Sequence, residues 1–330
     1  MDLAQQYKMI ENLTRQRDGN KLCAIMGDII HKLTGAKYLK LHLVNEGGNE
    51  ISAANDNPIE SSGVLSTSIS EEDLQLIQSV DYQRFDAESP YLAQNGFTIL
   101  PLYDDASMLG MIIIDKDIPE QHKLFTKVLL RVFINQYTLI NYCMKDALTG
   151  LFNRQAFDKI MKRIIDGQEM PSRRKDDAPT GDWYFALIDI DHFKQVNDQF
   201  GHIYGDEVLL LFSRIMNQSF RGDDLLFRYG GEEFAIALRN VNNDTSNRAL
   251  ERLRSNVEKY DFPQVGKVTI SIGYTNIKPN IMISTITDEA DKALYFAKEH
   301  GRNQTHHYEH LIQSGLLSAN SYDSQDVELF

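Results

Sequence analysis

The 330-residue sequence contains only two cysteines, Cys23 and Cys143, and eight prolines. The cysteines lie far apart without a metal-ligand spacing, so both are expected to be reduced thiols. No apolar run reaches the ~18 residues that a membrane-spanning helix needs, and residues 1–21 lack the pattern of a signal peptide. These absences predict a soluble, cytoplasmic protein that makes no membrane contact.

Basic residues are also scarce, since the chain has 34 Lys and Arg and 47 Asp and Glu, which gives a formal net charge of −13. This balance opposes non-specific binding to DNA or to anionic membranes, because both reward clustered Lys and Arg. The length suggests two domains, and a hydrophobic content of 42% is ample for packed cores. We therefore expect partners other than nucleic acids and membranes.

Two adjacent carboxylates, Glu232 and Glu233, follow a double glycine between the apolar, β-prone residues 225–229 and 234–238. The double glycine predicts a tight hairpin turn, and glycine also lets the backbone approach a bulky ligand closely. Carboxylates placed there can hold a metal against a phosphate. Taken alone, the pattern fits an ordinary hairpin with two solvated glutamates equally well.

A second acidic cluster, Asp189 and Asp191, ends the buried strand predicted for residues 184–190. If these carboxylates face the glutamate pair on a neighbouring hairpin, they form the oxygen-rich site that Mg²⁺ prefers when it also takes substrate phosphates. Two such metals could activate an attacking hydroxyl and stabilise a leaving pyrophosphate. Either aspartate could instead cap the helix predicted for residues 193–200, and for Asp191 both alternatives stay open.

From residue 146 onward, helical and strand patterns alternate around one sheet, which predicts an α/β (α+β) fold. Helices are expected over residues 154–165, 193–200, 206–220, 245–260 and 284–300, and strands over residues 184–190, the hairpin and residues 267–274. Residues 171–181 are typical of a polar insertion, and residues 308–330 of a polar, disordered tail.

Residues 1–117 are expected to form a separate domain. Apolar residues at helical spacing predict a helix over residues 22–33 that stops at Gly35. Strands are then expected over residues 38–44, 49–54, 63–69, 97–103 and 109–115, with a helix over residues 71–80 among them.

Residues 118–145 are expected to form one long linker helix, with Pro119 near its start, where a missing N–H has no consequence. Its apolar positions fall close to one face: Phe125, Leu129, Phe133, Tyr137, Ile140 and Met144. In a dimer such a stripe could form a parallel coiled coil. It could also pack against the sheet of the preceding domain, and both could hold along different turns.

Five ordered motifs resemble those of the GGDEF family of diguanylate cyclases. They are residues 146–154 (DALTGLFNR), residues 189–194 with Asn197 and Asp198, Gly201-His202 with Gly205-Asp206, residues 228–234 (RYGGEEF), and residues 291–298 with Gly301-Arg302-Asn303. The resemblance covers residues 145–307. It implies a domain over residues 146–307 that is similar to the nucleotidyl cyclase and polymerase palm, and synthesis of cyclic di-GMP and two pyrophosphates from two GTP molecules.

The resemblance also implies residue roles. Asp189, Glu232 and the carbonyl of Ile190 match the ligands of Mg²⁺ or Mn²⁺, and Glu233 joins Asp189 and Glu232 as a catalytic residue. The positions that match substrate-binding residues are Phe193, Lys194, Asn197, Asp206, Lys298 and Arg302. Of these, Asn197 and Asp206 would read the guanine edge, while Lys298 and Arg302 would hold the β- and γ-phosphates.

An inhibitory site for the product is implied by Arg221 and Asp224, which match the family's RxxD motif before the double glycine. Arg252 resembles the arginine that completes that site, although Arg254 is near enough to leave the choice open. The family works as a homodimer, because each domain holds one GTP and the two must meet.

The N-terminal domain resembles a GAF domain in its closing hairpin, Pro101-Leu102 followed by residues 109–115. This implies a GAF-like or PAS-like sensor for an unknown ligand, and the alternative is a domain that only dimerises. Two other functions are alternatives to the cyclase: a non-catalytic cyclic di-GMP receptor that uses the RxxD site, and a cyclase with a hybrid product. Acids are present at positions 189, 232 and 233, and Asp at 206, which favours an active diguanylate cyclase.

Overall fold

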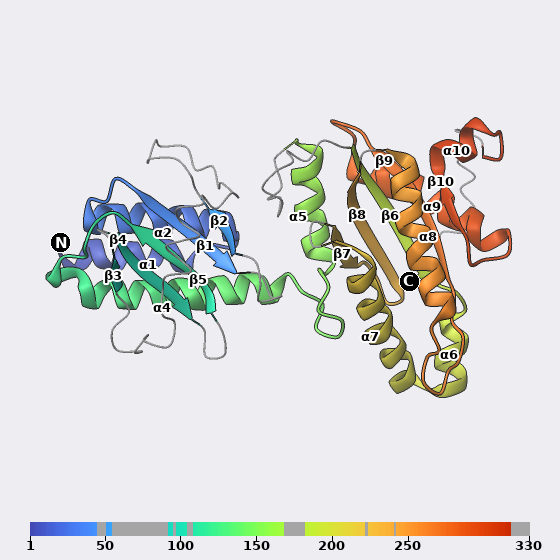
Figure 1. The fold of residues 1–330 in the computed structure, drawn as a ribbon, viewed down its shortest axis with the longest axis horizontal. Coiled ribbons are helices and arrows are strands. Elements are labelled where there is room, and N and C mark those ends of the chain that lie inside the picture. The colour runs from blue at the N-terminus through green and yellow to red at the C-terminus, as the bar shows by residue number, and fades with distance from the viewer. Residues whose placement is uncertain are drawn as a thin grey trace. The chain divides into compact units, whose positions relative to one another are not determined.

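The computed structural model describes residues 1–44, 51–54, 92–94, 97–103, 108–167, 182–221, 224–240 and 242–317. The chain divides into two compact units, one of residues 1–143 and one that begins at Met144 (Figure 1). The strand expected over residues 63–69, the helix over residues 71–80 and the insertion at residues 171–181 lie outside the described residues.

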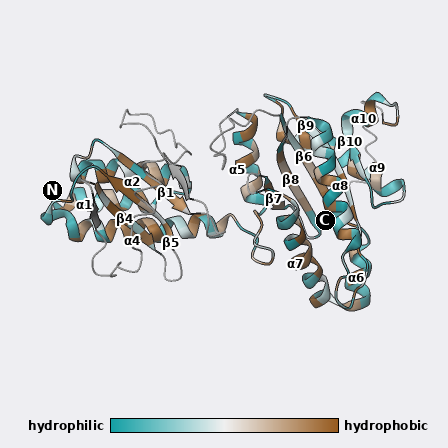
Figure 2. Ribbon diagram, viewed as in Figure 1, coloured by the Kyte–Doolittle hydropathy of each residue, from teal (hydrophilic) through white to brown (hydrophobic). Residues whose placement is uncertain are grey.

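The first unit is an antiparallel sheet with helices packed against it. Its strands run in the order β2-β1-β5-β4-β3, and Figure 2 shows hydrophobic residues concentrated along β4. The elements are α1 (Leu3–Thr14), α2 (Gly19–Thr34), β1 (Leu39–Val44), β2 (Ile51–Ala54), β3 (Leu92–Gln94), β4 (Phe97–Tyr103), β5 (Met108–Ile114) and α4 (Glu120–Cys143). Helix α2 ends at Gly35 in a left-handed conformation (φ 66°), which confirms the predicted stop.

Helix α4 buries the apolar stripe of the linker inside the first unit. Leu129 and Phe133 are 0% and 1% exposed, and they share one core with Leu13 of α1 and Met26 of α2. Because these side chains are already covered by their own domain, the coiled-coil interpretation of this stripe is wrong and the alternative, packing within the domain, is the one observed.

Another face of α4 carries large apolar side chains that remain exposed. They are Leu124 (77%), Val128 (43%), Leu139 (54%) and Tyr142 (73%). In the part of the chain that the structure describes, neither α4 nor any other helix combines the length and the apolar character needed to cross a membrane.

The second unit is built on a sheet with the strand order β10-β9-β6-β8-β7, in which β6 is antiparallel to both β8 and β9. Its elements are α5 (Arg154–Ile165), β6 (Asp182–Ile190), α6 (Phe193–Phe200), α7 (His202–Ser219), β7 (Leu225–Arg228), β8 (Glu233–Asn240), α8 (Asn243–Lys259), β9 (Ile270–Ile277), α9 (Ile283–Glu299), β10 (Thr305–His307) and α10 (Tyr308–Gln313).

Strand β6 is buried on both faces, since helices cover the sheet on both sides (Figure 1). Ala186 and Ile188 belong to a core with α7 and α8, whereas Phe185 and Leu187 belong to a core with α5 and α9. Side chains alternate between the two faces of a strand. Asp189 therefore points toward the α5 and α9 side at the point where the strand ends.

Most boundaries differ from the predictions by one to three residues, and three differences bear on the site or on the end of the chain. Helix α7 begins at His202 rather than residue 206, because the chain breaks at Gly201 (φ 87°) while Gly205 lies buried inside the helix. Strand β9 begins at Ile270 rather than residue 267. The prediction of a disordered tail from residue 308 is wrong for its first part, since α10 buries Leu311 against α9.

Helix α9 approaches β9 closely at Gly273. A methyl group on Gly273 would meet the main chain of α9, at the amide nitrogen of Leu294 and the carbonyl oxygen of Ala290. Main-chain atoms of a packed helix have little room to move away. Only glycine therefore allows this contact between helix and sheet.

Replacing Gly273 by alanine is expected to lower the free energy of unfolding of the second unit by about 1–3 kcal/mol, the usual range for overpacking. The single tryptophan, Trp183 on β6, reports this unfolding by fluorescence in a denaturant titration. Gly231→Ala is the matched control, because a methyl group there would meet no atom within 4 Å. Wild-type stability of Gly273→Ala would contradict the close packing.

Candidate active site

Strand pairing brings the predicted catalytic acids together at the end of β6. Asp189 lies directly opposite Glu233 of β8 and opposite Ser271 of β9. Residues directly opposite each other in a pair of strands point to the same face. Lys298 reaches this face from α9, and its Nζ lies 2.9 Å from Oδ2 of Asp189.

The pKa values of these acids are raised by burial first and by neighbouring acids second. Burial raises the pKa of Asp189, and the Lys298 ammonium and the Arg302 guanidinium act in the opposite direction. Partial burial raises the pKa of Glu232 and of Glu233, and the charge of Asp189 raises both further. Burial is thus the main cause of all three raised pKa values, and the charge of Asp189 adds to those of Glu232 and Glu233.

This donor set fits a hard divalent cation that is shared with a substrate. Among the described residues, no three His, Cys, Asp or Glu side chains converge closely enough to hold a metal unaided. Mg²⁺ is ordinarily held by one or two carboxylates and completes its octahedron with water and substrate phosphates. Two carboxylates, Asp189 and Glu232, beside the main chain of Ile190 match that requirement.

The signature hairpin is wider than the predicted tight turn, because four residues from Tyr229 to Glu232 join β7 to β8. The amides of Tyr229 and Gly230 both donate to the carbonyl of Glu233, over 2.8 and 3.1 Å. A Cβ on Gly230 would lie 2.5 Å from Oε2 of Glu233, whereas Gly231 has open space around it. The first glycine thus makes room for Glu233, and the second leaves the main chain accessible.

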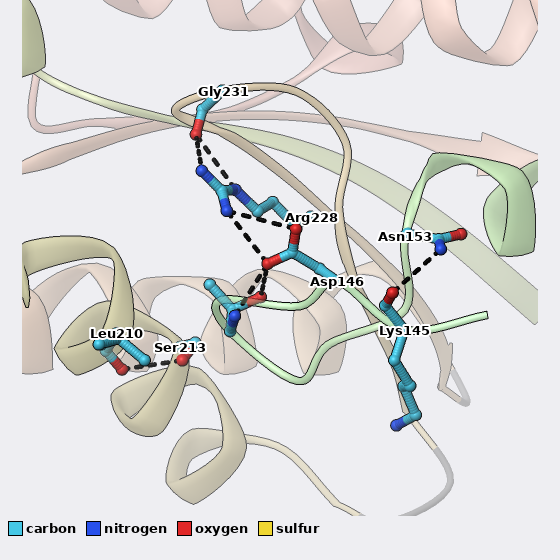
Figure 3. Close-up of polar contacts among 8 residues, drawn as sticks. Lys145, Asp146, Asn153, Leu210, Ser213, Arg228 and Gly231 are labelled. Atoms are coloured by element: carbon cyan, nitrogen blue, oxygen red, sulfur yellow. Dashed lines mark hydrogen bonds and ion pairs between the residues drawn. The ribbon is translucent and has the colours of Figure 1, made fainter. Parts of the chain in front are cut away.

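Arg228 fastens this turn to the start of the second unit (Figure 3). Its guanidinium donates to the carbonyl of Gly231 over 3.2 and 2.8 Å and to Oδ1 of Asp146 over 3.1 Å. Asp146 also accepts from the amide and hydroxyl of Thr149. The sequence alone predicts no role for Asp146 or Arg228, and their opposite charges are the only signal of this contact.

Arg154 and Tyr229 form a further contact that the sequence did not reveal. The Arg154 guanidinium lies 3.5 Å from the centroid of the Tyr229 ring, a cation–π geometry. Tyr229 also packs edge-to-face on Phe157. These contacts connect the first turns of α5 with the residue before the double glycine.

The predicted guanine readers lie on neighbouring helices. A Cβ on Gly205 of α7 would collide with Oδ1 of Asn197 on α6, so glycine at that position provides the space for Asn197. Asp206 and Lys194 are exposed. Phe193 is 5% exposed and belongs to the hydrophobic core. Any contact between Phe193 and a substrate would therefore involve its main chain.

Asp191 is not the cap of α6, because the cap residue is His192 and no side chain bonds the helix start. Its carboxylate instead accepts from the hydroxyls of Thr269 and Ser271, each over 2.7 Å, and from the amide of Asn303 over 3.0 Å. Asp191 is 5% exposed. Its bonds therefore tie the end of β6 to β9 and to the turn after α9.

Two of the predicted inhibitory residues, Arg221 and Asp224, are bonded to each other beyond the end of α7. The amide of Arg221 donates to Oδ2 of Asp224 over 2.9 Å. Arg252 donates to the carbonyl of Ser219, two residues before Arg221, over 2.6 Å. Arg254 instead binds Glu251 and Glu258. Arg252 rather than Arg254 thus lies beside the end of α7, where Arg221 follows.

The ion pair of Asp146 with Arg228 should make part of the stability depend on pH. Burial would raise the pKa of Asp146, but the bonds from Thr149 and the charge of Arg228 lower it below its ordinary value. A depressed folded-state pKa contributes stability that is present above the unfolded pKa and is lost as pH falls through the folded one.

Asp146→Asn should therefore unfold at a lower denaturant concentration than wild type near pH 7, and the difference should shrink below about pH 4, the ordinary range of aspartate. Trp183 fluorescence in urea titrations at several pH values measures the gap. Asp158→Asn, on the exposed side of α5, is the control. A gap that is independent of pH would show that the charge of Asp146 contributes nothing.

Comparison with known proteins agrees with this geometry. Residues 143–304 match the family model described as diguanylate cyclase, GGDEF domain. Probable diguanylate cyclase DgcT of Escherichia coli (strain K12) is 39% identical over 50% of this chain and 35% of its own length. Diguanylate cyclase DgcM of the same strain is 34% identical over 62% of this chain and 45% of its own length.

Among solved structures, the coiled coil and GGDEF domain of DgcB from Caulobacter crescentus in complex with c-di-GMP is 26% identical. It aligns with a TM-score of 0.48 over 55% of this chain and 94% of that chain. The chain spans less than half the length of the two curated relatives named above. Residues 143–304 of this chain are a GGDEF domain of the diguanylate cyclase family.

Proposed function

We propose that the protein is a diguanylate cyclase that condenses two GTP molecules into cyclic di-GMP and releases two pyrophosphates. The observation that carries this proposal is the arrangement at the end of β6, where Asp189 faces Glu233 and pairs with Lys298. The relatives named diguanylate cyclases support the same reaction.

Asp189, Glu232 and the carbonyl of Ile190 would hold Mg²⁺ or Mn²⁺. The cation would supply Lewis-acid polarisation of a phosphoryl oxygen and activation of the attacking hydroxyl. Lys298 lies beside Asp189, so its ammonium would also be close to a triphosphate bound to a metal held by Asp189. Arg302, which acts electrostatically on Asp189, would bind phosphate oxygens through its planar fork.

Guanine recognition would fall to Asn197 of α6 and Asp206 of α7. A carboxylate accepts hydrogen bonds from the N1 and N2 donors of guanine, and an amide can both donate and accept. The exposure of Asp206 leaves its carboxylate accessible to a base. Lys194 would add positive charge near the phosphates, and the open main chain at Gly231 would allow close approach of the nucleotide.

Replacing Asp189 or Glu233 by alanine should abolish formation of cyclic di-GMP. Loss of one oriented group of this kind costs on the order of 10²-fold or more in rate. Mass spectrometry after incubation with GTP, ATP and Mg²⁺ identifies the product and separates a diguanylate cyclase from a hybrid cyclase. Asp158→Ala is the control, because it removes an exposed carboxylate from α5.

Full activity of Asp189→Ala, or turnover in excess EDTA, would contradict the assignment. Wild-type protein that binds cyclic di-GMP but forms none would instead favour the non-catalytic receptor. That receptor would use the RxxD site, which consists of Arg221 and Asp224 with Arg252 nearby. In an active cyclase, the same three residues would bind the product and inhibit the enzyme.

The regions before residue 146 would regulate this reaction. We assign residues 1–117 to a GAF-like sensor for an unknown ligand, residues 118–145 to the linker and residues 146–307 to the catalytic domain. All catalytic positions follow Asp146 in the sequence. A sensor ligand would change the rate only if it binds one arrangement of the protein better than another.

Activity would require a homodimer, since each domain offers one GTP site and two GTP molecules must react. The exposed face of α4, with Leu124, Val128, Leu139 and Tyr142, is the surface we assign to the partner copy. Val128 and Tyr142 are separated by two heptads, the spacing that keeps side chains on one seam of a parallel coiled coil. Leu129 and Phe133 are excluded because they lie in the core.

Leu124→Glu combined with Val128→Glu should weaken the dimer and lower specific activity at low protein concentration, because buried charges oppose association. Analytical ultracentrifugation and rate measurements over a concentration series test both effects. Leu3→Glu, at another exposed leucine (83%), is the matched control. A double variant that is monomeric yet fully active would refute the requirement for a dimer.

A further inference from the structure

The turn that follows α9 has an unusual backbone. Arg302 and Asn303 both adopt positive φ angles, 60° and 51°. Two successive residues with side chains are rarely found in this left-handed region, since Cβ crowds the following carbonyl. Such a pair persists only where surrounding contacts hold it. The contacts that hold Arg302 and Asn303 therefore determine where the Arg302 side chain is presented.

Asn303 is held by both its side chain and its main chain. Its Oδ1 accepts from Arg254 over 2.7 Å, and its Nδ2 donates to Glu258 over 2.8 Å, both on α8. Its main-chain amide donates to Oδ2 of Asp191 over 3.0 Å. The amide of Arg302 continues the end of α9 by donating to the carbonyl of Ala297.

Asp191 is itself fixed from β9. Its two oxygens accept from Thr269, Ser271 and Asn303, and its amide donates to the carbonyl of Thr269 over 2.9 Å. A carboxylate offers about four acceptor positions, so most of its capacity is used within the protein. A buried carboxylate so occupied is suited to hold a turn rather than to contact a substrate.

We propose that Asp191 is a positioning residue that acts through Arg302, by bonding the Asn303 amide and so holding the turn that directs the Arg302 guanidinium toward the phosphate end of the site. This inference rests on the proposed function for the identity of the ligand. It separates two aspartates of the same motif: Asp189 faces the site beside Lys298, while Asp191 faces the turn.

The first test follows the turn without any nucleotide. Asp191→Asn keeps one carbonyl oxygen but loses the charge, and hydrogen exchange at the Asn303 amide is measured in the full-length protein. Faster exchange at Asn303 than in wild type, with unchanged exchange along β6, is the expected result. A fully protected Asn303 amide in Asp191→Asn would overturn the proposal, whatever the protein catalyses.

The second test measures affinity by calorimetry, with Mg²⁺, for a non-hydrolysable GTP analogue and for GMP. Asp191→Asn should weaken binding of the GTP analogue on the order of tenfold, the scale seen for residues that support a ligand-binding group. Binding of GMP, which lacks the β- and γ-phosphates, should stay near that of wild type. Equal losses for both nucleotides would indicate a merely structural role and overturn the proposal.

A double-mutant cycle identifies the residue through which Asp191 acts. Asp191→Asn combined with Arg302→Ala should bind the GTP analogue no more weakly than Arg302→Ala alone. Additive losses would show that Asp191 acts elsewhere. If the wild-type protein bound neither nucleotide, the proposed function would fail, while hydrogen exchange would still decide whether Asp191 holds the turn.

A milder variant keeps the proposal testable if Asp191→Asn does not fold. Ser271→Ala removes one donor to Asp191 and should weaken binding of the GTP analogue in the same direction by a smaller factor. Ser213→Ala is the matched control, because Ser213 is also buried but donates only to Leu210 of its own helix (Figure 3). Equal effects of the two serine variants would count against the proposal.

Discussion

The candidate active site depends on two carboxylates, Asp189 and Glu233, that lie opposite each other where β6 ends and β8 begins. Like charges directly across a pair of strands are destabilising. Their register persists because β6 is buried on both faces, and a shift of one residue would exchange the side chains that pack in the two cores on either side of the sheet. The hydrophobic layers thus maintain an arrangement that the acids alone would oppose.

The charge that offsets this repulsion comes from α9, which carries Lys298 and leads into Arg302. Its position depends on the absence of a side chain at Gly273, where helix and strand backbones meet. Beyond the C-terminal end of α9, the turn that contains Asn303 is bonded to Asp191 and to α8. Packing at one point and hydrogen bonds at another therefore fix where the positive charge lies relative to the acids.

Sequence patterns predicted elements best where periodicity and end signals agree. The predicted bounds of α5 and α6 coincide with those observed. The helix predicted to begin at residue 206 begins at His202, and Gly205 lies inside it, where its missing side chain makes room for Asn197. The stripe of α4 showed that one face is apolar, but not whether its own domain or a second copy covers it. Composition also concealed α10, whose anchor is the single buried residue Leu311.

The family resemblance named most of the site, and the structure adds the residues that support it. Arg228 bonds the signature turn and Asp146 at once, and Asp146 follows the last residue of α4 by only three positions. Asp146 is also the third residue of the second unit, which begins at Met144. The Arg228 guanidinium therefore anchors the main chain that precedes Glu232 to the first residues of its own unit.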